Sequence, residues 1–319
     1  MVVPSHGAAR VLPGLLDALE RQTLAPDRFE ILVADPGTDG AARVLDERLA
    51  RWRGAPLRIL RAPLDGGPAA KRNLAVNEAA GELLAFTDAD CRPEPGWLEA
   101  GLAASNEADL VQGRTLPPVG AQWHPLSHAI RIEAESGLFE TCNLFARTAL
   151  VRSLGGFTTR YFTRYGVPFG EDAELGWRAR RSGARFAFAS AAVVRHPVGE
   201  PSLRAHVRER WTTRGFPALV ADVPELRDRL WSGLFLSRRS AETWLAAAGA
   251  LLALSAGRRR AVLGAALALP YAARLGGELR RWPPGPRGRA GYAAAKATGD
   301  LVRAAALAQG SVRARTLVL

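Results

Sequence analysis

Short apolar runs alternate with amphipathic stretches over the first 200 residues of the chain. The apolar runs, which we predict to be strands, are residues 1–4, 30–34, 57–61, 83–87, 139–146 and 186–195. The amphipathic stretches, which we predict to be helices, are residues 8–22, 41–53, 68–80, 97–104 and 171–182. Strands that alternate with helices of this length are typical of βαβ units. The pattern therefore predicts an α/β fold with a mostly parallel sheet flanked by helices.

Two stretches lack a regular period. Residues 117–125 are predicted to be irregular, and residues 161–170, which carry aromatic side chains and glycine, are predicted to form a loop.

Aspartates follow two of the predicted strands. Asp35 ends the second strand, and Asp88 and Asp90 come directly after the fourth. Ligands of parallel sheets bind at the carboxyl ends of the strands. Buried carboxylates need a positive partner, so the i, i+2 pair indicates a hard divalent cation, Mg²⁺ or Mn²⁺, with bound phosphates. The alternative is that these residues open turns or cap a helix, which aspartate also favours.

The positive charge is concentrated near the C-terminus. The chain of 319 residues has a net charge of +12, with 29 basic and 28 acidic residues over positions 1–230. Residues 231–319 contain 14 basic residues against three acidic ones. This composition shift marks the clearest domain boundary. The basic residues flank alanine-rich apolar segments, which indicates an anionic membrane surface as partner and no nucleic acid.

Two apolar segments, residues 243–256 and 261–273, are separated by Arg258, Arg259 and Arg260. Spanning a bilayer takes about 20 apolar residues, so both segments are short. We expect two shallow or re-entrant helices at a membrane. The alternative is a soluble helical pair that packs on the N-terminal domain. Residues 290–319 are predicted to be a basic amphipathic helix that becomes strand-like from Arg315.

The two cysteines, Cys91 and Cys142, form no C-x-x-C pattern and no disulfide framework, which favours a reduced compartment. No G-x-G-x-x-G follows the first predicted strand, so the sequence lacks a dinucleotide-binding fingerprint.

Seven stretches occur in an order that is similar to one known family. They are Val2-Val3-Pro4-Ser5, residues 33–40 with Asp35, Lys71-Arg72-Asn73 at the end of residues 67–73, Phe86-Thr87-Asp88-Ala89-Asp90, residues 142–147, Gly155-Gly156-Phe157, and Gly170-Glu171-Asp172 within residues 170–175. Over about residues 1–200 the chain resembles the family 2 glycosyltransferases, which have the Rossmann-like GT-A fold, and in particular their membrane-associated bacterial members.

The resemblance implies a donor site. Asp35 would hydrogen-bond the nucleotide base, and Arg72 would lie near the nucleotide. Asp88 would contact the ribose or the metal, while Asp90 would bind the Mn²⁺ or Mg²⁺ that bridges the donor diphosphate. His196 matches a position where some members supply a further metal ligand. The matching stretches also place three residues beside the donor: Pro4, Ser5 and Ala89. Arg72 could instead be a solvated helix residue, and His196 a structural one.

On the acceptor side the resemblance implies that Asp172 is the general base. Glu171, Arg210 and Trp211 are candidates for contacting the acceptor. Acidic residues are also favoured at a helix start by the helix dipole, which is the alternative reading of Glu171 and Asp172.

Two departures from the family pattern refine the expectation. Pro36 replaces a second acid that commonly follows the base-binding aspartate, which leaves the donor preference open. Processive members carry Gln-x-x-Arg-Trp; here Arg210 and Trp211 are present but the glutamine is absent. Transfer of a single sugar is therefore expected.

The sequence thus predicts a catalytic domain (1–200), linker helices (201–230), an apolar helical pair associated with the membrane (231–277) and a basic tail (278–319). The expected activity is inverting, metal-dependent transfer of a hexosyl group. The donor would be UDP-, GDP- or dTDP-linked, and the acceptor a lipid-linked or cell-envelope precursor at the cytoplasmic face of the plasma membrane.

Two alternatives remain. A nucleotidyltransferase that forms sugar nucleotides would need a glycine-rich basic loop after the first strand, which residues 5–10 match poorly. An inactive membrane scaffold is disfavoured because Asp88, Asp90 and Asp172 are all present.

Overall fold

The computed structural model describes residues 1–38, 40–64, 67–122, 124, 126–166, 169–255, 257–281 and 285–319. The chain divides into two compact units. The first, here called the N-terminal unit, comprises Met1–Trp123 and His128–Gly199, and the second, the C-terminal unit, comprises His124–Ser127 and Glu200–Leu319.

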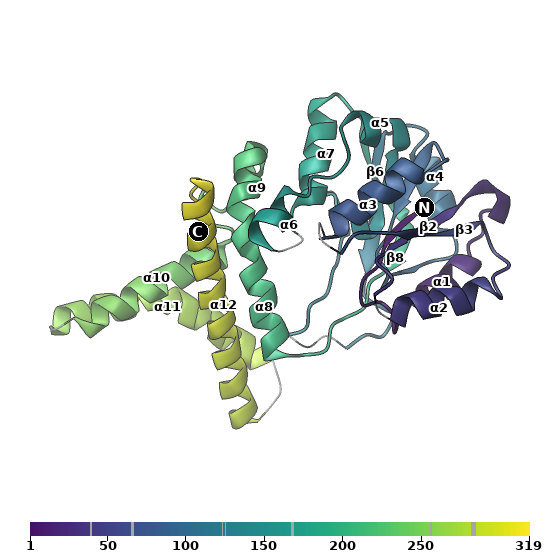
Figure 1. Cartoon of the computed structure of the whole chain (residues 1–319). Helices are drawn as coiled ribbons and strands as arrows, with labels where there is room; N and C mark the ends of the chain where they lie inside the picture. The colour runs from purple at the N-terminus through teal and green to yellow at the C-terminus, as the bar shows by residue number, and fades with distance from the viewer. Residues whose placement is uncertain are drawn as a thin grey trace. The chain divides into compact units, whose positions relative to one another are not determined.

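An eight-stranded sheet forms the centre of the N-terminal unit (Figure 1). Its strands are β1 (Val2–Pro4), β2 (Ile31–Asp35), β3 (Leu57–Arg61), β4 (Leu83–Phe86), β5 (Arg92–Pro93), β6 (Leu110–Leu116), β7 (Leu144–Arg147) and β8 (Phe186–Arg195). The order across the sheet is β3-β2-β1-β4-β7-β6-β8-β5. Strand β7 runs antiparallel to β4 and β6, and β5 runs antiparallel to β8, whereas the other neighbours are parallel. The sheet is therefore mixed.

The strand directions bring the carboxyl ends of β1, β2, β4 and β8 to one edge of the sheet. Pro4 lies opposite Ala34 in the β1–β2 register. At the end of β8 the backbone N–H of His196 donates to the carbonyl of Leu116 at 2.8 Å. Because β7 runs the other way, its first residue lies at this same edge. The edge carries the candidate site.

Helices cover both faces of the sheet because alternate strand residues point to opposite sides. Val3 belongs to a core cluster with α1 (Leu12–Glu20), α2 (Gly40–Leu49) and α4 (Trp97–Ala104). Val2 belongs to the second cluster, with α3 (Gly67–Glu78), α5 (Thr148–Ser153) and α7 (Glu171–Arg181). The remaining elements are α6 (Arg160–Tyr165) and the 3₁₀ turns η1 (Pro26–Arg28) and η2 (Thr141–Asn143).

Three sequence-based expectations for this unit were incomplete. Strand β6 was not predicted, because it contains the buried polar residue Gln112, whose side-chain amide donates to the Asn143 carbonyl at 2.8 Å. Within the predicted strand 139–146, residues 141–143 form η2, and the strand begins only at Leu144. The predicted loop 161–170 contains α6, while Val167 and Pro168 lie outside the described residues.

The C-terminal unit is helical. Its elements are α8 (Leu203–Thr212), η3 (Thr213–Gly215), α9 (Phe216–Asp222), η4 (Pro224–Arg229), α10 (Arg238–Leu254), α11 (Arg258–Arg281) and α12 (Pro286–Ala314). Helices α10 and α11 lie side by side as a hairpin, and α12 packs on α8 and α9 (Figure 1). Gly299 and Gly310 allow the close approach of α12, since added Cβ atoms would meet His206 and the Arg214 carbonyl.

The predicted segment 261–273 lies within α11. Residues 243–254 of the other segment lie within α10, whereas Ser255 follows that helix and Ala256 falls outside the described residues. None of the helices formed by the described residues combines the length and apolar character needed to cross a membrane. The predicted C-terminal helix ends at Ala314, because Arg315 adopts a left-handed conformation with φ 51°. The last residue then pairs its backbone with Leu234 and Leu236, at 3.0 and 2.7 Å.

Candidate active site

Two buried polar atoms lie at the ends of neighbouring strands β1 and β2. Asp35 is fully buried, and its Oδ1 accepts a hydrogen bond from the Gly37 N–H at 2.7 Å. Its Oδ2 has no hydrogen-bond partner among the described residues, and the same holds for Oγ of the buried Ser5. Leaving such groups unpaired costs about 1–3 kcal/mol each. Both atoms are therefore candidates for pairing with a ligand that carries hydrogen-bonding groups.

A second cluster lies where β4 and β8 end. Nε2 of His196 is 3.8 Å from Oδ1 of Asp90, and Cys91 completes a group of three potential metal-binding side chains. The His196 Nδ1 lies 3.0 Å from the Pro197 carbonyl. When Nδ1 donates there, the tautomer leaves the Nε2 lone pair free for a metal.

The donor atoms fit a hard or borderline divalent cation. A carboxylate and an imidazole suit Mn²⁺, and the remaining positions of a six-coordinate ion can be taken by phosphate oxygens and water. The thiol of Cys91 does not fit. Burial, and then the carboxylates of Asp88 and Asp90, raise its pKa well above the ordinary value, and a soft thiol is a poor ligand for a hard cation.

Arg72 links Asp88, which follows β4, to the start of helix α7. The guanidinium is buried and donates to Oδ1 of Asp88 at 3.1 Å and to Oε1 of Glu171 at 3.3 Å. Burial alone would lower the pKa of Arg72, but the carboxylates of Asp88 and Glu171 reverse this effect and raise it. A planar guanidinium can bridge two carboxylates in a fixed geometry, which a lysine cannot.

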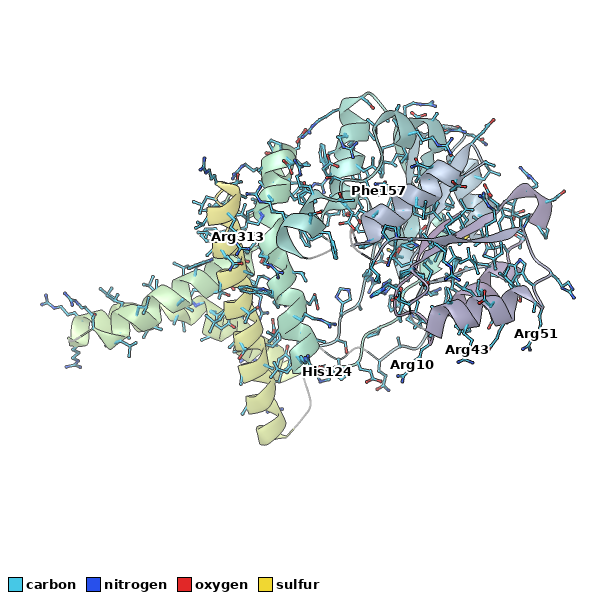
Figure 2. All side chains as sticks on the ribbon, in the orientation of Figure 1. Arg10, Arg43, Arg51, His124, Phe157 and Arg313 are labelled. Atoms are coloured by element: carbon cyan, nitrogen blue, oxygen red, sulfur yellow. The ribbon has the colours of Figure 1, made fainter. Side chains whose placement is uncertain are left out.

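The turn at Gly155-Gly156-Phe157 fixes the position of Arg72. Asn73 and Phe157 exchange two hydrogen bonds of 2.7 Å, one in each direction. Gly156 has φ +74°, and a Cβ there would lie 2.5 Å from Oδ1 of Asn73. The Phe157 ring, labelled in Figure 2, packs edge-on against Phe86 and lies 5.7 Å from the Arg72 guanidinium carbon. The turn therefore holds α3 against the end of β4.

Asp172 lies in the first turn of α7. Its Oδ1 accepts from the Ala173 N–H at 3.0 Å, and its Oδ2 accepts from the Thr141 N–H at 3.3 Å. Burial, and then the charge of Glu171, raise the pKa of Asp172 to about 7, although Arg72 opposes the shift. A carboxylate with a pKa near neutrality can both accept and release a proton at physiological pH.

The structure brings most of the predicted residues to one edge of the sheet. Arg72, Asp88 and Glu171 form one ion-paired group next to Asp172, and Asp90 meets His196. Asp88, predicted to contact the ribose or the metal, is paired with Arg72. The individual roles of these residues stay predictions.

The other predicted contact residues are placed as follows. Pro4 ends β1, and Ala89 follows β4; both are buried. Arg210 and Trp211 lie on α8 in the C-terminal unit, and their contact with an acceptor stays a prediction.

Sequence reasoning assigned no role to three residues that shape the site. Asn73 and Phe157 stood inside stretches that carried the family resemblance, so their place in the motifs was the available signal. Glu140 had no such signal. Burial raises its pKa, and its charge adds to the forces that raise the pKa of Asp172.

The strand-end site and the mixed sheet define an α/β protein of the GT-A type. The sequence profile of Glycosyl transferase family 2 matches residues 1–153. This match lies within the N-terminal unit and confirms, for that part of the chain, the resemblance seen in the sequence.

Curated relatives carry related names. The chain is 27% identical over 209 residues to the glycosyltransferase AglE of Haloferax volcanii, covering 62% of this chain and 66% of AglE. It is also 27% identical over 215 residues to the pre-mycofactocin glycosyltransferase of Mycobacterium tuberculosis, covering 61% of this chain and 42% of that protein. The chain thus matches slightly less than two thirds of the length of AglE and under half of the second relative.

Among solved structures, the chain is similar to the mannosyltransferase PcManGT from Pyrobaculum calidifontis, which was solved in complex with GDP-Man and Mn²⁺. The TM-score is 0.62 at 17% sequence identity, and the match covers 97% of this chain and 85% of that one. This similarity shows the fold.

Proposed function

We propose that this protein is an inverting, metal-dependent glycosyltransferase that moves one sugar from a nucleoside diphosphate donor to a hydroxyl group of its acceptor. One observation carries the proposal. The buried Arg72 contacts Asp88 with one nitrogen and Glu171 with another, so the donor side and the candidate base Asp172 share one rigid link.

The donor side offers groups for each part of a nucleotide sugar. The free Oδ2 of Asp35 and Oγ of Ser5 can pair with the hydrogen-bonding edge of a base. Asp90 and His196 would hold Mn²⁺ or Mg²⁺, which when bound neutralises charge on the diphosphate. The complex of PcManGT with GDP-Man and Mn²⁺ supports a donor and metal of this class, and UDP- and dTDP-sugars are the other candidates.

The chemistry follows from the assignment of Asp172 as the base on the acceptor side. Asp172 accepts the proton of the acceptor hydroxyl, and the oxygen of that hydroxyl forms a bond to the anomeric carbon of the sugar. The bond from that carbon to the diphosphate oxygen breaks on the opposite face, and the nucleoside diphosphate leaves with the electron pair. One displacement of this kind inverts the anomeric configuration.

The acceptor class and the location are part of the proposal. Residues 231–319 contain 14 basic residues against three acidic ones, which favours work at an anionic membrane surface. We therefore propose a lipid-linked or cell-envelope acceptor at the cytoplasmic face of the plasma membrane.

The test is a transfer assay with the full chain and a panel of UDP-, GDP- and dTDP-sugars, with and without Mn²⁺. The donor that binds will raise the melting temperature. Asp172→Asn should reduce transfer at least about 1,000-fold while donor affinity stays within a few-fold, as expected when a group acts mainly in the transition state. Asp46→Asn on the exposed surface of α2 is the matched control. Full transfer by Asp172→Asn, or retention of anomeric configuration by NMR, would refute the proposal.

A further inference from the structure

Exposed apolar side chains gather on the α10–α11 hairpin of the C-terminal unit. On α10, Leu251 and Leu254 are 72% and 85% exposed. On α11, Val262 and Leu263 are 63% and 59% exposed, and Leu269 is similarly open. We call Leu251, Leu254, Val262, Leu263 and Leu269 the outer hairpin face. Exposed apolar side chains that gather on one part of a protein mark interaction surfaces.

The two helices of the hairpin pack closely where two glycines meet. Gly249 and Gly264 face each other, and a Cβ on either would collide with the backbone carbonyl of the other. Helices that meet at paired glycines approach closely at that point, and Leu267 packs beside Gly249 there. Helices α10 and α11 therefore form a close pair (Figure 1).

Positive charge borders the outer hairpin face. Arg258, Arg259 and Arg260 are exposed at the start of α11, directly beside Leu254 and Val262 in the sequence. Arg280 and Arg281 are exposed at the other end of α11. The sequence contains no acidic residue between Glu242 and Glu278.

We propose that the α10–α11 hairpin docks on an anionic lipid surface. The outer hairpin face enters the boundary between headgroups and acyl chains, and Arg258, Arg259 and Arg260 contact the lipid phosphates. An anionic surface complements the positive charge of these arginines. The hairpin of a second copy would offer no negative charge in return, because no acidic residue lies between Glu242 and Glu278.

This inference deepens the proposed function, on which it rests for the nature of the acceptor. A lipid-linked hydroxyl lies at the membrane surface, so a docking hairpin would keep the enzyme where its acceptor is. Vesicle binding is measured without donor or acceptor, and it can therefore fail or succeed independently of sugar transfer.

The experiment is flotation of the full chain with vesicles of pure phosphatidylcholine or of phosphatidylcholine mixed with phosphatidylglycerol. Binding should require the anionic lipid and weaken as salt is raised. Replacing Arg258, Arg259 and Arg260 together with glutamine should lower the affinity about 100-fold, from about five-fold for each arginine. The matched control replaces three exposed arginines of the N-terminal unit and should change binding less than about two-fold: Arg43, Arg51 and Arg53, the first two labelled in Figure 2.

A second set of variants tests the apolar side chains. Leu254→Ser with Leu263→Ser should abolish binding even at low salt, because both side chains lose their transfer into lipid. Leu301→Ser with Val312→Ser on α12, where the side chains are 54% and 80% exposed, is the control and should bind normally. Circular dichroism melting verifies that every variant is folded.

Three results would overturn the proposal. The first is equal binding to neutral and anionic vesicles, and the second is unchanged binding by the hairpin variants. The third is a dimer, detected by sedimentation, that becomes monomeric in the leucine variants although these variants still bind vesicles. Transfer to a water-soluble acceptor should remain intact in the hairpin variants. If the wild type binds anionic vesicles but transfers no sugar, only the proposed function fails.

Discussion

Replacement of Asp172 by asparagine should stabilise the folded protein at high pH while it removes the proposed base. The pKa of Asp172 in the folded chain is raised from 3.8 to about 7, first by burial and then by Glu171. A raised folded-state pKa stabilises the fold fully at pH values below 3.8. That stabilisation is lost as the pH rises through about 7, because the native state must then hold a disfavoured charge.

The pKa shift of Asp172 from 3.8 to about 7 would correspond, without solvent screening, to about 4 kcal/mol in the free energy of unfolding. The Asp172 side chain is partly exposed, and solvent screening reduces the effect to about 1–2 kcal/mol. Asparagine has nearly the same shape and can still accept one of the hydrogen bonds that the Ala173 and Thr141 N–H groups donate. The charge is therefore the main difference between the two side chains.

Urea unfolding of the wild type and of Asp172→Asn at about pH 4 and about pH 8 provides the measurement, with the exposed Asp46→Asn as control. The two proteins should be equally stable at about pH 4, and the variant should be more stable by about 1–2 kcal/mol at about pH 8. In parallel, kcat/KM of the wild type should fall about ten-fold for each pH unit below about 7. A variant that is less stable than the wild type at about pH 8 would contradict the argument.

Three further perturbations test the site. Arg72→Lys keeps a positive charge but cannot bridge two carboxylates, so kcat should fall about 100-fold with little change in donor affinity; unchanged kcat would show that the bridge has no role. Cys91→Ser should leave Mn²⁺ affinity within about two-fold by calorimetric titration, whereas His196→Ala should weaken it at least about ten-fold; the opposite order would make the thiol a ligand. Gly156→Ala should lower the unfolding free energy by about 2–3 kcal/mol, because its Cβ has no room, and Gly155→Ala by only about 1 kcal/mol, because its φ of +78° is equally strained but the space is open. Equal losses at the two glycines would refute the steric part of that reasoning.

Much of the fold was accessible from the sequence alone. The alternation of apolar runs and amphipathic stretches located β1, β2, β3, β4 and β8 and the helices α1, α2, α3, α4 and α7, because these periods are local properties of the chain. Asp35 and Asp88 were expected at strand ends, where the structure places them. The ordered motifs identified the family.

The strand directions and the unrecognised β6 depend on contacts between distant segments. Strand β6 lacks a recognisable pattern of apolar residues because it contains Gln112, which is buried and hydrogen-bonded to a carbonyl 31 residues away. Strand β7 is antiparallel because of the neighbours it pairs with, and residues 144–147 alone carry no sign of direction.

The sequence by itself determined the elements, the family and the chemistry of the candidate residues, since each of these follows from residue type and local order. Only the tertiary structure decided how those residues act on one another. Arg72 meets Glu171 across 99 residues of chain, and the pKa of Asp172 depends on burial and on the charges that folding brings beside it. Gly249 and Gly264, unremarkable in the sequence, allow the close approach of α10 and α11. Burial and proximity exist only once the chain is folded, and these two quantities give ordinary side chains their particular properties.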